Sequence, residues 1–325
     1  MRKGLVVIGF LFVTNASSAQ ISVGPEIAKK TKKQQEFGAN DLEILRNTRT
    51  LFVYRSQDEK HLDSFKAEMS RVWDYTELEF ISYSDYARKQ ISGTYSDGYS
   101  FLTIKSYLKV YTFKDGTSTR NVFNYLQLWT VNSGDLLNFC RLELFPTPAT
   151  IDHVYKNEMG FIEKMKFLYD KAEYYNWNLV SLKNALNFFN RRLKKSEEYL
   201  FAQTKRVSLE LTTLISDTLY VPEYCLYYFK SSVGYDKTYV YSKSSLFHRY
   251  SYAYRVVSVD ELNGIIKHTQ KPVLYLSSIR TDTAFYIGVI DGRTGEYVYS
   301  SYRYRNRNIS TEDIHKIARA AKKSK

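Results

Sequence analysis

The sequence predicts an α/β protein of two tandem units, each with the element order β-α-β-α-β-β and a mixed sheet, joined by a helical segment. Strand-like and helix-like apolar spacings alternate in both halves, a purely helical pattern lies between the halves, and short segments of the second half resemble segments of the first. An α+β arrangement is the alternative. The predicted boundaries are 41–150 for the first α/β unit, 151–205 for the helical connector and 206–325 for the second α/β unit.

The first unit is predicted to begin with a short helix near Asp41 and a strand at 50–54. The helix that follows is recognised by apolar residues three and four positions apart, with charged residues on its other faces. These apolar residues are Leu62, Phe65, Met69 and Val72. The remaining predicted elements are a strand at 78–83, a helix at 84–91 and a hairpin whose strands cover 99–113 and 121–131.

The connector has apolar residues at helical spacing only. One stripe consists of Ile162, Met165, Leu168, Ala172 and Tyr175, and the next consists of Leu179, Leu182, Leu186, Phe189 and Leu193. Between these stripes, the segment Asn176-Trp177-Asn178 predicts a break or a helix N-cap. The sequence leaves open whether the connector is a helical hairpin or one long helix.

The second half is predicted to repeat the first, beginning with a strand at 218–221 that matches 50–53. Its later elements are a hairpin at 272–278 and 284–290, a third strand through Tyr297 and Tyr299, and a final helix from Ser310. Residues 224–255 are crowded with tyrosine. The counterpart of the first unit's long helix is therefore expected to be replaced by loop or strand.

A matching strand-to-helix junction supports the duplication. In each half a strand ends on a serine, Ser82 or Ser258, whose hydroxyl is expected to cap the following helix. A carboxylate three residues later, in Asp85 or Glu261, is expected to reach back to the cap. The two serines should therefore occupy equivalent places in the two sheets.

Residues 1–19 have the pattern of a secretory signal peptide. Basic residues precede an apolar run at 5–13, and small residues follow it up to Ala19. This run is about half the ~20 residues that a membrane-spanning helix needs. We therefore expect cleavage after Ala19, no membrane span in the mature chain, and a periplasmic or secreted protein. Residues 20–40, which contain several lysines and little apolar periodicity, are predicted to form a flexible leader.

The chain is strongly basic, with a formal net charge of +13, and 30 of its 325 residues are tyrosine. Such a charge usually indicates binding to nucleic acid, but an exported protein rarely meets nucleic acid. The expected partners are therefore an anionic glycan, a lipid surface such as lipopolysaccharide, or an envelope protein, and no nucleic acid. A solvated basic surface without any partner is the alternative.

Short catalytic and cofactor signatures are absent from the sequence. It has no G-x-S-x-G, H-E-x-x-H, G-x-G-x-x-G or P-loop lysine pattern, so no cofactor or metal site is predicted and no catalytic residue is identified. The two cysteines, Cys140 and Cys225, are far apart in sequence. They are compatible with one long-range disulfide or with two separately buried thiols.

The most unusual segment lies near the C-terminus, where tyrosine and arginine alternate. If this segment is a strand, its arginines point to one side and its tyrosines to the other. The candidate binding stripe consists of Tyr302, Arg303, Tyr304, Arg305 and Arg307. Tyrosine rings stack on sugars, and arginine forks bind carboxylate or phosphate. The alternative is a cationic edge strand that discourages aggregation.

Several weak motifs resemble a family of exported Bacteroidetes proteins of unknown function. They are the processing site at Ala19-Gln20, the strand at 50–54, the tryptophan Trp73 near the end of the next helix, the segment 294–297, and Asp313-Ile314. This resemblance covers most of the mature chain. It implies export, and it implies no activity, because the family has none established.

Two functions of different classes fit these features. The first is an exported, non-catalytic protein of the cell envelope that binds or helps assemble an anionic partner. The alternative is a hydrolase of envelope polymers whose catalytic residues converge only in the fold. A deep pocket with two or more ionisable residues favours the enzyme, whereas a shallow surface of tyrosine and arginine favours binding.

Overall fold

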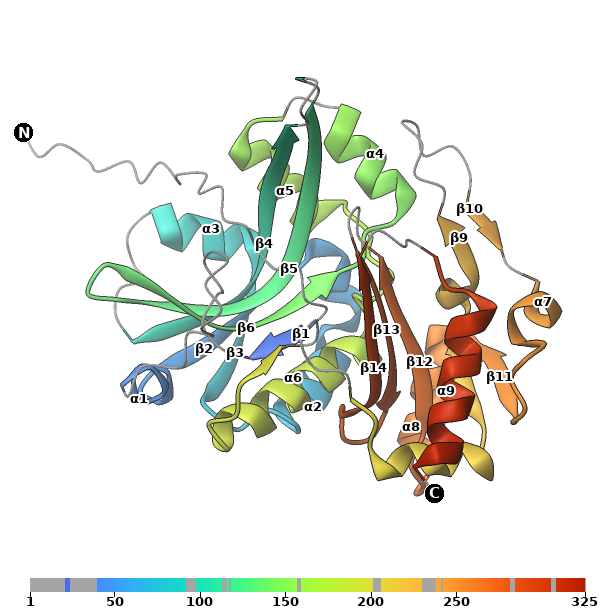
Figure 1. Cartoon of the computed structure of the whole chain (residues 1–325). Helices are drawn as coiled ribbons and strands as arrows, with labels where there is room; N and C mark the ends of the chain where they lie inside the picture. Colours follow the sequence, from blue (N-terminus) through green and yellow to red (C-terminus); the bar gives the residue numbers. More distant parts are fainter. Residues whose placement is uncertain are drawn as a thin grey trace, which may run out of the picture.

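Two mixed sheets stand side by side, with helix α6 (Leu179–Lys194) between them (Figure 1). The computed structural model describes residues 21–23, 40–91, 98–112, 116, 118–156, 159–200, 206–229, 238–240, 242–280, 284–304 and 308–324. The predicted signal peptide, 1–19, lies outside the described residues.

The first sheet has the strand order β3-β2-β4-β5-β6-β1-β7 in the described part of the chain. Its strands are β1 (Ile21–Val23), β2 (Arg49–Tyr54), β3 (Glu77–Ser82), β4 (Tyr99–Thr112), β5 (Ser118–Asn132), β6 (Asp135–Leu144) and β7 (Tyr199–Leu200). Strand β2 is parallel to both of its neighbours, β3 and β4. All later pairs, from β4-β5 to β1-β7, are antiparallel.

The second sheet has the order β11-β8-β12-β13-β14. Its strands are β8 (Leu219–Pro222), β11 (Tyr254–Val257), β12 (Leu274–Arg280), β13 (Ala284–Asp291) and β14 (Tyr297–Tyr304). Strand β8 is parallel to β11 and β12, while β12-β13 and β13-β14 are antiparallel. In both sheets the first strand of the unit therefore lies between the second and the third, and the fourth and fifth follow in antiparallel order. The predicted α/β fold of two similar units is confirmed.

The two junction serines occupy equivalent places. Ser82 is the last residue of β3, and its Oγ accepts a hydrogen bond of 3.1 Å from the backbone N of Asp85 in α3 (Tyr83–Ile91). Ser258 caps α8 (Val259–His268), and its Oγ accepts a 3.1 Å bond from the backbone N of Glu261. The carboxylate of Asp85 does reach back, because it accepts the Ser82 hydroxyl at 2.9 Å. The carboxylate of Glu261 instead pairs with Arg255.

Helices cover both faces of each sheet. In each unit the first crossover leads to the strand on one side of the first strand, and the second crossover leads back to the strand on its other side. Right-handed crossovers in opposite directions place their helices on opposite faces. In the first unit, α2 (Leu62–Ser70) contacts α6, while α3 lies on the other face, where the Tyr86 ring contacts Phe101. In the second unit, α8 contacts α6, and α7 (Lys243–Phe247) packs on α9 (Thr311–Lys323).

The connector is divided into separate helices, so the long-helix alternative is wrong. They are α4 (Pro148–Lys156), α5 (Phe161–Asp170) and α6. Asn178 is the predicted N-cap, with its Oδ1 accepting a 3.0 Å bond from Ser181 N. The helix ends at Lys194 rather than continuing through the connector, since Ser196 takes a positive φ of 55° and β7 follows.

Two further predictions concern the leader at 20–40 and the tyrosine-rich segment 224–255. Residues 21–23 were expected to belong to a flexible leader, but they form β1, which bridges β6 and β7. Residues 24–39 of that leader lie outside the described part. In the second unit, the place of α2 is taken by the turn η3 (Glu223–Leu226), the strand pair β9 (Tyr227–Phe229) and β10 (Thr238–Val240), and the short α7.

Helix α6 is the centre of the molecule. One continuous hydrophobic core extends through both units, and α6 contributes to it on several sides. Its Phe188 contacts Tyr199 of the first sheet and Tyr297 of the second, with ring centroids 4.9 and 5.8 Å apart. The buried residues of α6 are Val180, Leu182, Lys183, Asn184, Ala185, Leu186, Phe188, Phe189, Asn190 and Leu193. No helix among the described residues is long and apolar enough to cross a membrane.

Candidate functional site

The carboxyl ends of the parallel strands form the expected ligand-binding edge of each sheet. In open α/β sheets, ligands bind outside these ends at the point where the strand order reverses. In the first unit this point follows β2, and the residues that occupy it are Arg55 and Asp58, which are 4% and 7% exposed. Asp58 Oδ2 accepts hydrogen bonds from Arg55 N at 3.1 Å and from Trp177 Nε1 at 2.9 Å. This buried ion pair therefore depends on a tryptophan from the distant α5–α6 loop.

Burial governs the electrostatics of this pair. Desolvation lowers the pKa of Arg55 and raises the pKa of Asp58, while the attraction between the two groups opposes both shifts. The guanidinium carbon of Arg55 also lies 5.7 Å from the ring centre of Tyr174 and 5.3 Å from that of Trp177. These contacts leave both charged groups enclosed by protein, so the pair fits a structural role better than substrate binding.

The end of α5 covers the rest of this edge. The Tyr169 ring stacks on Tyr83, just after β3, with centroids 4.1 Å apart. Ser56 Oγ donates a 2.8 Å hydrogen bond to Asp170 at the end of the same helix. The crevice that the strand order predicts is therefore filled by the chain's own side chains.

The corresponding edge of the second unit follows β8. There η3 buries Tyr224 and Cys225. The ring of Tyr175 stacks on that of Tyr224, with centroids 5.9 Å apart, and meets Tyr227 edge-on at 5.5 Å. The α5–α6 loop thus reaches the carboxyl edges of both sheets.

The cysteines form two separately buried thiols and no disulfide. Cys140 lies in β6 of the first unit, and Cys225 lies in η3 of the second. Burial raises the pKa of Cys140 well above its ordinary value, so its thiol stays protonated at neutral pH. Of the two arrangements that the sequence allowed, the structure has the separate thiols.

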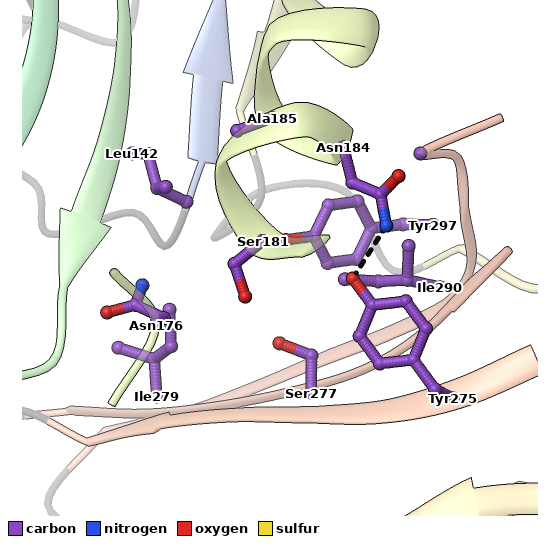
Figure 2. A pocket seen from close by; sticks show the side chains of 11 residues that line it. Leu142, Asn176, Ser181, Asn184, Ala185, Tyr275, Ser277, Ile279, Ile290 and Tyr297 are labelled. Atoms are coloured by element: carbon purple, nitrogen blue, oxygen red, sulfur yellow. Dashed lines mark hydrogen bonds between the residues drawn. The ribbon is translucent and has the colours of Figure 1, made fainter. Parts of the chain in front are cut away.

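A small cavity lies between the units, where α6 faces β12 (Figure 2). Its volume is about 20 Å³, which is room for about one water molecule. Asn184 Nδ2 donates a 3.0 Å hydrogen bond to Tyr275 Oη at one side, and the hydroxyls of Ser181 and Ser277 lie at another. The lining residues are Leu142, Asn176, Ser181, Asn184, Ala185, Tyr275, Ser277, Ile279, Ile290, Gly295 and Tyr297.

The chemistry of this cavity is limited to hydrogen bonding. Its lining contains amides and hydroxyls but no carboxylate, histidine, cysteine, lysine or arginine. Burial raises the pKa of Tyr275 and Tyr297 far above neutral pH, so both phenols remain protonated. The cavity therefore offers no general acid or base near neutral pH and no space for a sugar ring.

The candidate stripe is only partly within the described residues, and the side chain of Arg303 is only 24% exposed. Arg303 pairs with the buried Asp313, and its guanidinium carbon lies 5.2 Å from the ring centre of Phe285. The Tyr302 ring contacts Tyr286 instead, at 5.2 Å. Asp313, which forms the capping box of α9, therefore holds the guanidinium of Arg303, and the binding stripe stays a prediction. The side chain of Tyr304 and the residues Arg305 and Arg307 lie outside the described part.

Part of the outer edge of β14 is also covered. Ser208 N donates to Val298 O at 2.9 Å, and Ser300 N donates to Arg206 O at 3.0 Å. These two hydrogen bonds pair β14 with the chain just before the turn η2 (Leu209–Ile215). Edge protection at this point therefore comes from backbone pairing, in addition to any effect of the cations.

Exposed cations gather instead on α9, outside the candidate stripe. The cationic face of α9 consists of Lys316, Arg319, Lys322 and Lys323, all exposed. None of the four is in an ion pair with another described residue, because the acids of the helix are already paired. Glu312 pairs with Arg249 at 3.2 Å, and Asp313 pairs with Arg303.

The side-chain groups that the sequence did not predict join elements far apart in the chain. No local motif links Trp177 to Arg55 and Asp58. The α9 face had a weak signal, since lysine and arginine recur at three- and four-residue spacing from Lys316 to Lys323. Within the described ranges, no group of three histidine, cysteine or acidic side chains is placed to hold a metal ion.

Comparisons of the chain with protein-family models, with curated proteins and with solved structures found no match. The resemblance to exported Bacteroidetes proteins therefore stays a prediction. The function is argued below from the residues of this chain alone.

Proposed function

We propose that the protein is exported and that its mature form binds an anionic partner of the cell envelope without catalysing a reaction. The partner is an anionic glycan, a lipid surface or an envelope protein. The observation that carries this proposal is the cationic face of α9, where four exposed cations have no acidic partner among the described residues.

The spacing of these cations supports binding to an extended anionic surface. Lys316, Arg319 and Lys323 lie three and four residues apart, so they project from the same side of the helix. Arginine offers a planar fork for phosphate or carboxylate, and lysine offers a mobile point charge. The side of α9 opposite to them buries Ile314, Ile317 and Ala321 in the core, which fixes the direction in which the cations point.

The described interior supports the non-catalytic part of the proposal. In each mixed sheet, the carboxyl edge of the parallel strands is filled by aromatic side chains of the α5–α6 loop. The cavity between the units is lined by groups that stay uncharged at neutral pH. Nothing in these places favours the hydrolase alternative.

Neutralising the cationic face should weaken binding at least about tenfold at low salt and flatten its salt dependence. The variant carries Lys316→Gln, Arg319→Gln, Lys322→Gln and Lys323→Gln. Each exposed cation adds a screened attraction to an anionic surface, and its removal takes that salt-sensitive contribution away. Equilibrium binding of the purified mature protein to lipopolysaccharide, acidic glycans and anionic vesicles measures this effect.

A matched variant removes four exposed lysines from the first unit and the connector instead, through Lys60→Gln, Lys66→Gln, Lys166→Gln and Lys171→Gln. It lowers the net charge by the same amount but leaves α9 intact. If both variants lose the same affinity, net charge rather than the α9 face is responsible. Neither variant should lose more than about 1 kcal/mol of stability, because the replaced charges are exposed.

The export part of the proposal predicts a mature chain that begins at Gln20. Small residues precede this position, as signal peptidase requires. N-terminal analysis of protein recovered from the native envelope or culture fluid should show the loss of residues 1–19. Recovery of the chain with Met1 intact would reject this part of the proposal and leave the binding part to be tested separately.

A further inference from the structure

The loop between α5 and α6 contacts the carboxyl edge of both sheets at once. We propose that Tyr174, Tyr175 and Trp177 form a latch that couples the two units, so that neither edge opens without loosening the other. This proposal concerns how the molecule moves, and it is independent of the identity of any anionic partner.

Trp177 provides the contact with the first unit. Its Nε1 donates a 2.9 Å hydrogen bond to the buried carboxylate of Asp58, and its ring faces the guanidinium of Arg55. Its ring centre also lies 6.1 Å from that of Phe52 in β2. A hydrogen bond to a charged group is stronger than one between neutral groups, so this contact holds the loop firmly.

Tyr175 provides the contact with the second unit. Its ring stacks on Tyr224 of η3 and meets Tyr227 at the start of β9. Tyr174 points instead toward Arg55, whose guanidinium carbon lies 5.7 Å from its ring centre. Tyr174 and Tyr175 are adjacent in sequence, so a single short stretch of chain reaches both units.

The backbone of the latch is fixed to the end of β6. Asn176 Nδ2 donates to Glu143 O at 2.8 Å, and Asn176 Oδ1 accepts from Phe145 N at 2.7 Å. Tyr175 N also donates to Phe145 O at 2.8 Å. Two residues after Asn176, the side chain of Asn178 caps α6, so the latch continues directly into the helix between the sheets.

Coupling follows from this arrangement. Loss of the Trp177 anchor removes the side-chain contact that holds one end of the same short loop, whose neighbouring residue Tyr175 packs against η3. A local opening in the first unit is then transmitted to the second through the chain itself. A substitution that creates a cavity elsewhere in the core, far from the loop, lacks this connection between the units.

Hydrogen–deuterium exchange of the mature protein tests the latch. Trp177→Ala should raise exchange in β2 and also, by about tenfold or more, in η3 and β9 of the other unit. Phe101→Ala is the matched control, because it removes a buried aromatic ring from the small cluster with Leu51 and Trp129 on the opposite face of the first sheet. Its effect should stay within the first unit.

The outcome is decided by where exchange increases. An effect of Trp177→Ala confined to the first unit, like that of Phe101→Ala, would overturn the latch. If Trp177→Ala does not fold, Trp177→Phe keeps an aromatic ring but removes the hydrogen bond to Asp58 and part of the ring packing, and it should give a smaller increase in the same two places. The absence of any increase in η3 and β9 with that variant would equally reject the proposal.

Discussion

Replacing Asp58 with alanine should lower the free energy of unfolding by about 3–5 kcal/mol, because it leaves the guanidinium of Arg55 buried without its counter-charge. Arg55 is 4% exposed, so water cannot solvate the abandoned charge. The variant also removes the acceptor of the Trp177 hydrogen bond. Urea unfolding of the mature protein and the variant measures the difference.

Two comparisons show whether burial causes this loss. Glu312→Ala breaks an ion pair with Arg249 whose side chains are 45% and 48% exposed, and it should cost less than about 1 kcal/mol. The double variant Arg55→Met with Asp58→Leu removes both buried charges and should cost less than Asp58→Ala alone. A loss for Asp58→Ala as small as that for Glu312→Ala would contradict this account of the pair.

The same residue predicts a pH dependence. Desolvation raises the pKa of Asp58 above its ordinary value of 3.8, so the folded protein holds this proton more tightly than the unfolded chain. The contribution of Asp58 to the free energy of unfolding should therefore fall as pH rises from the ordinary to the raised pKa, and stay constant above it. Asp58→Asn should lose this component when unfolding is followed over the acid range.

Replacing Gly295 with alanine should cost about 2–5 kcal/mol, because two separate penalties combine there. Gly295 has a φ of +73°, which disfavours any side chain, and an added Cβ would lie 2.4 Å from the backbone O of Asn184 in α6. Backbone cannot move aside as a flexible side chain can. The turn would have to separate from α6, at the place where the second sheet packs on the central helix.

Gly134→Ala separates the two penalties. Gly134 has a φ of +89° in the β5–β6 turn, and an added Cβ there meets nothing within 4 Å. This variant should therefore show only the conformational cost, about 1–2 kcal/mol. Thermal and urea unfolding of both variants measure the difference, and equal losses would show that Gly295 does not approach α6 as closely as described.

Local sequence patterns predicted much of the fold because the interactions behind them are local. The caps at Ser82, Ser258 and Asn178 each join groups three residues apart, and all three form as expected. The alternation of strands and helices likewise predicted the two parallel crossovers of the first unit and the hairpins of both units. Such signals require no knowledge of which strand lies beside which.

The errors in the fold have particular physical reasons. Strand β1 has only three residues and is held by pairing with β6 and β7, so its own sequence carries almost no signal. Strand β6 was missed although Ser133 and Gly134, with φ of 51° and 89°, make the tight turn that leads into it. Serine is a weaker marker of such a turn than asparagine or aspartate before glycine.

Only the basic character of the candidate binding surface could be predicted from the sequence. The stripe at 302–307 was selected for its arginines, but the side chain of Arg303 is taken by Asp313. Pairing of Glu312 with Arg249 depends equally on the tertiary fold, because these residues lie 63 positions apart. Which cations stay exposed is therefore decided by long-range pairing, and this cannot be read from spacing.

The most direct test of the proposed function is the salt dependence of binding by residues 20–325, the mature chain that we expect. We expect it to bind at least one of lipopolysaccharide, an acidic glycan or anionic vesicles more tightly than a neutral counterpart, with an affinity that falls as salt is raised. The polymers should be recovered intact. Equal affinity for neutral and anionic surfaces, an affinity unaffected by salt, or release of smaller products from a polymer would contradict the account.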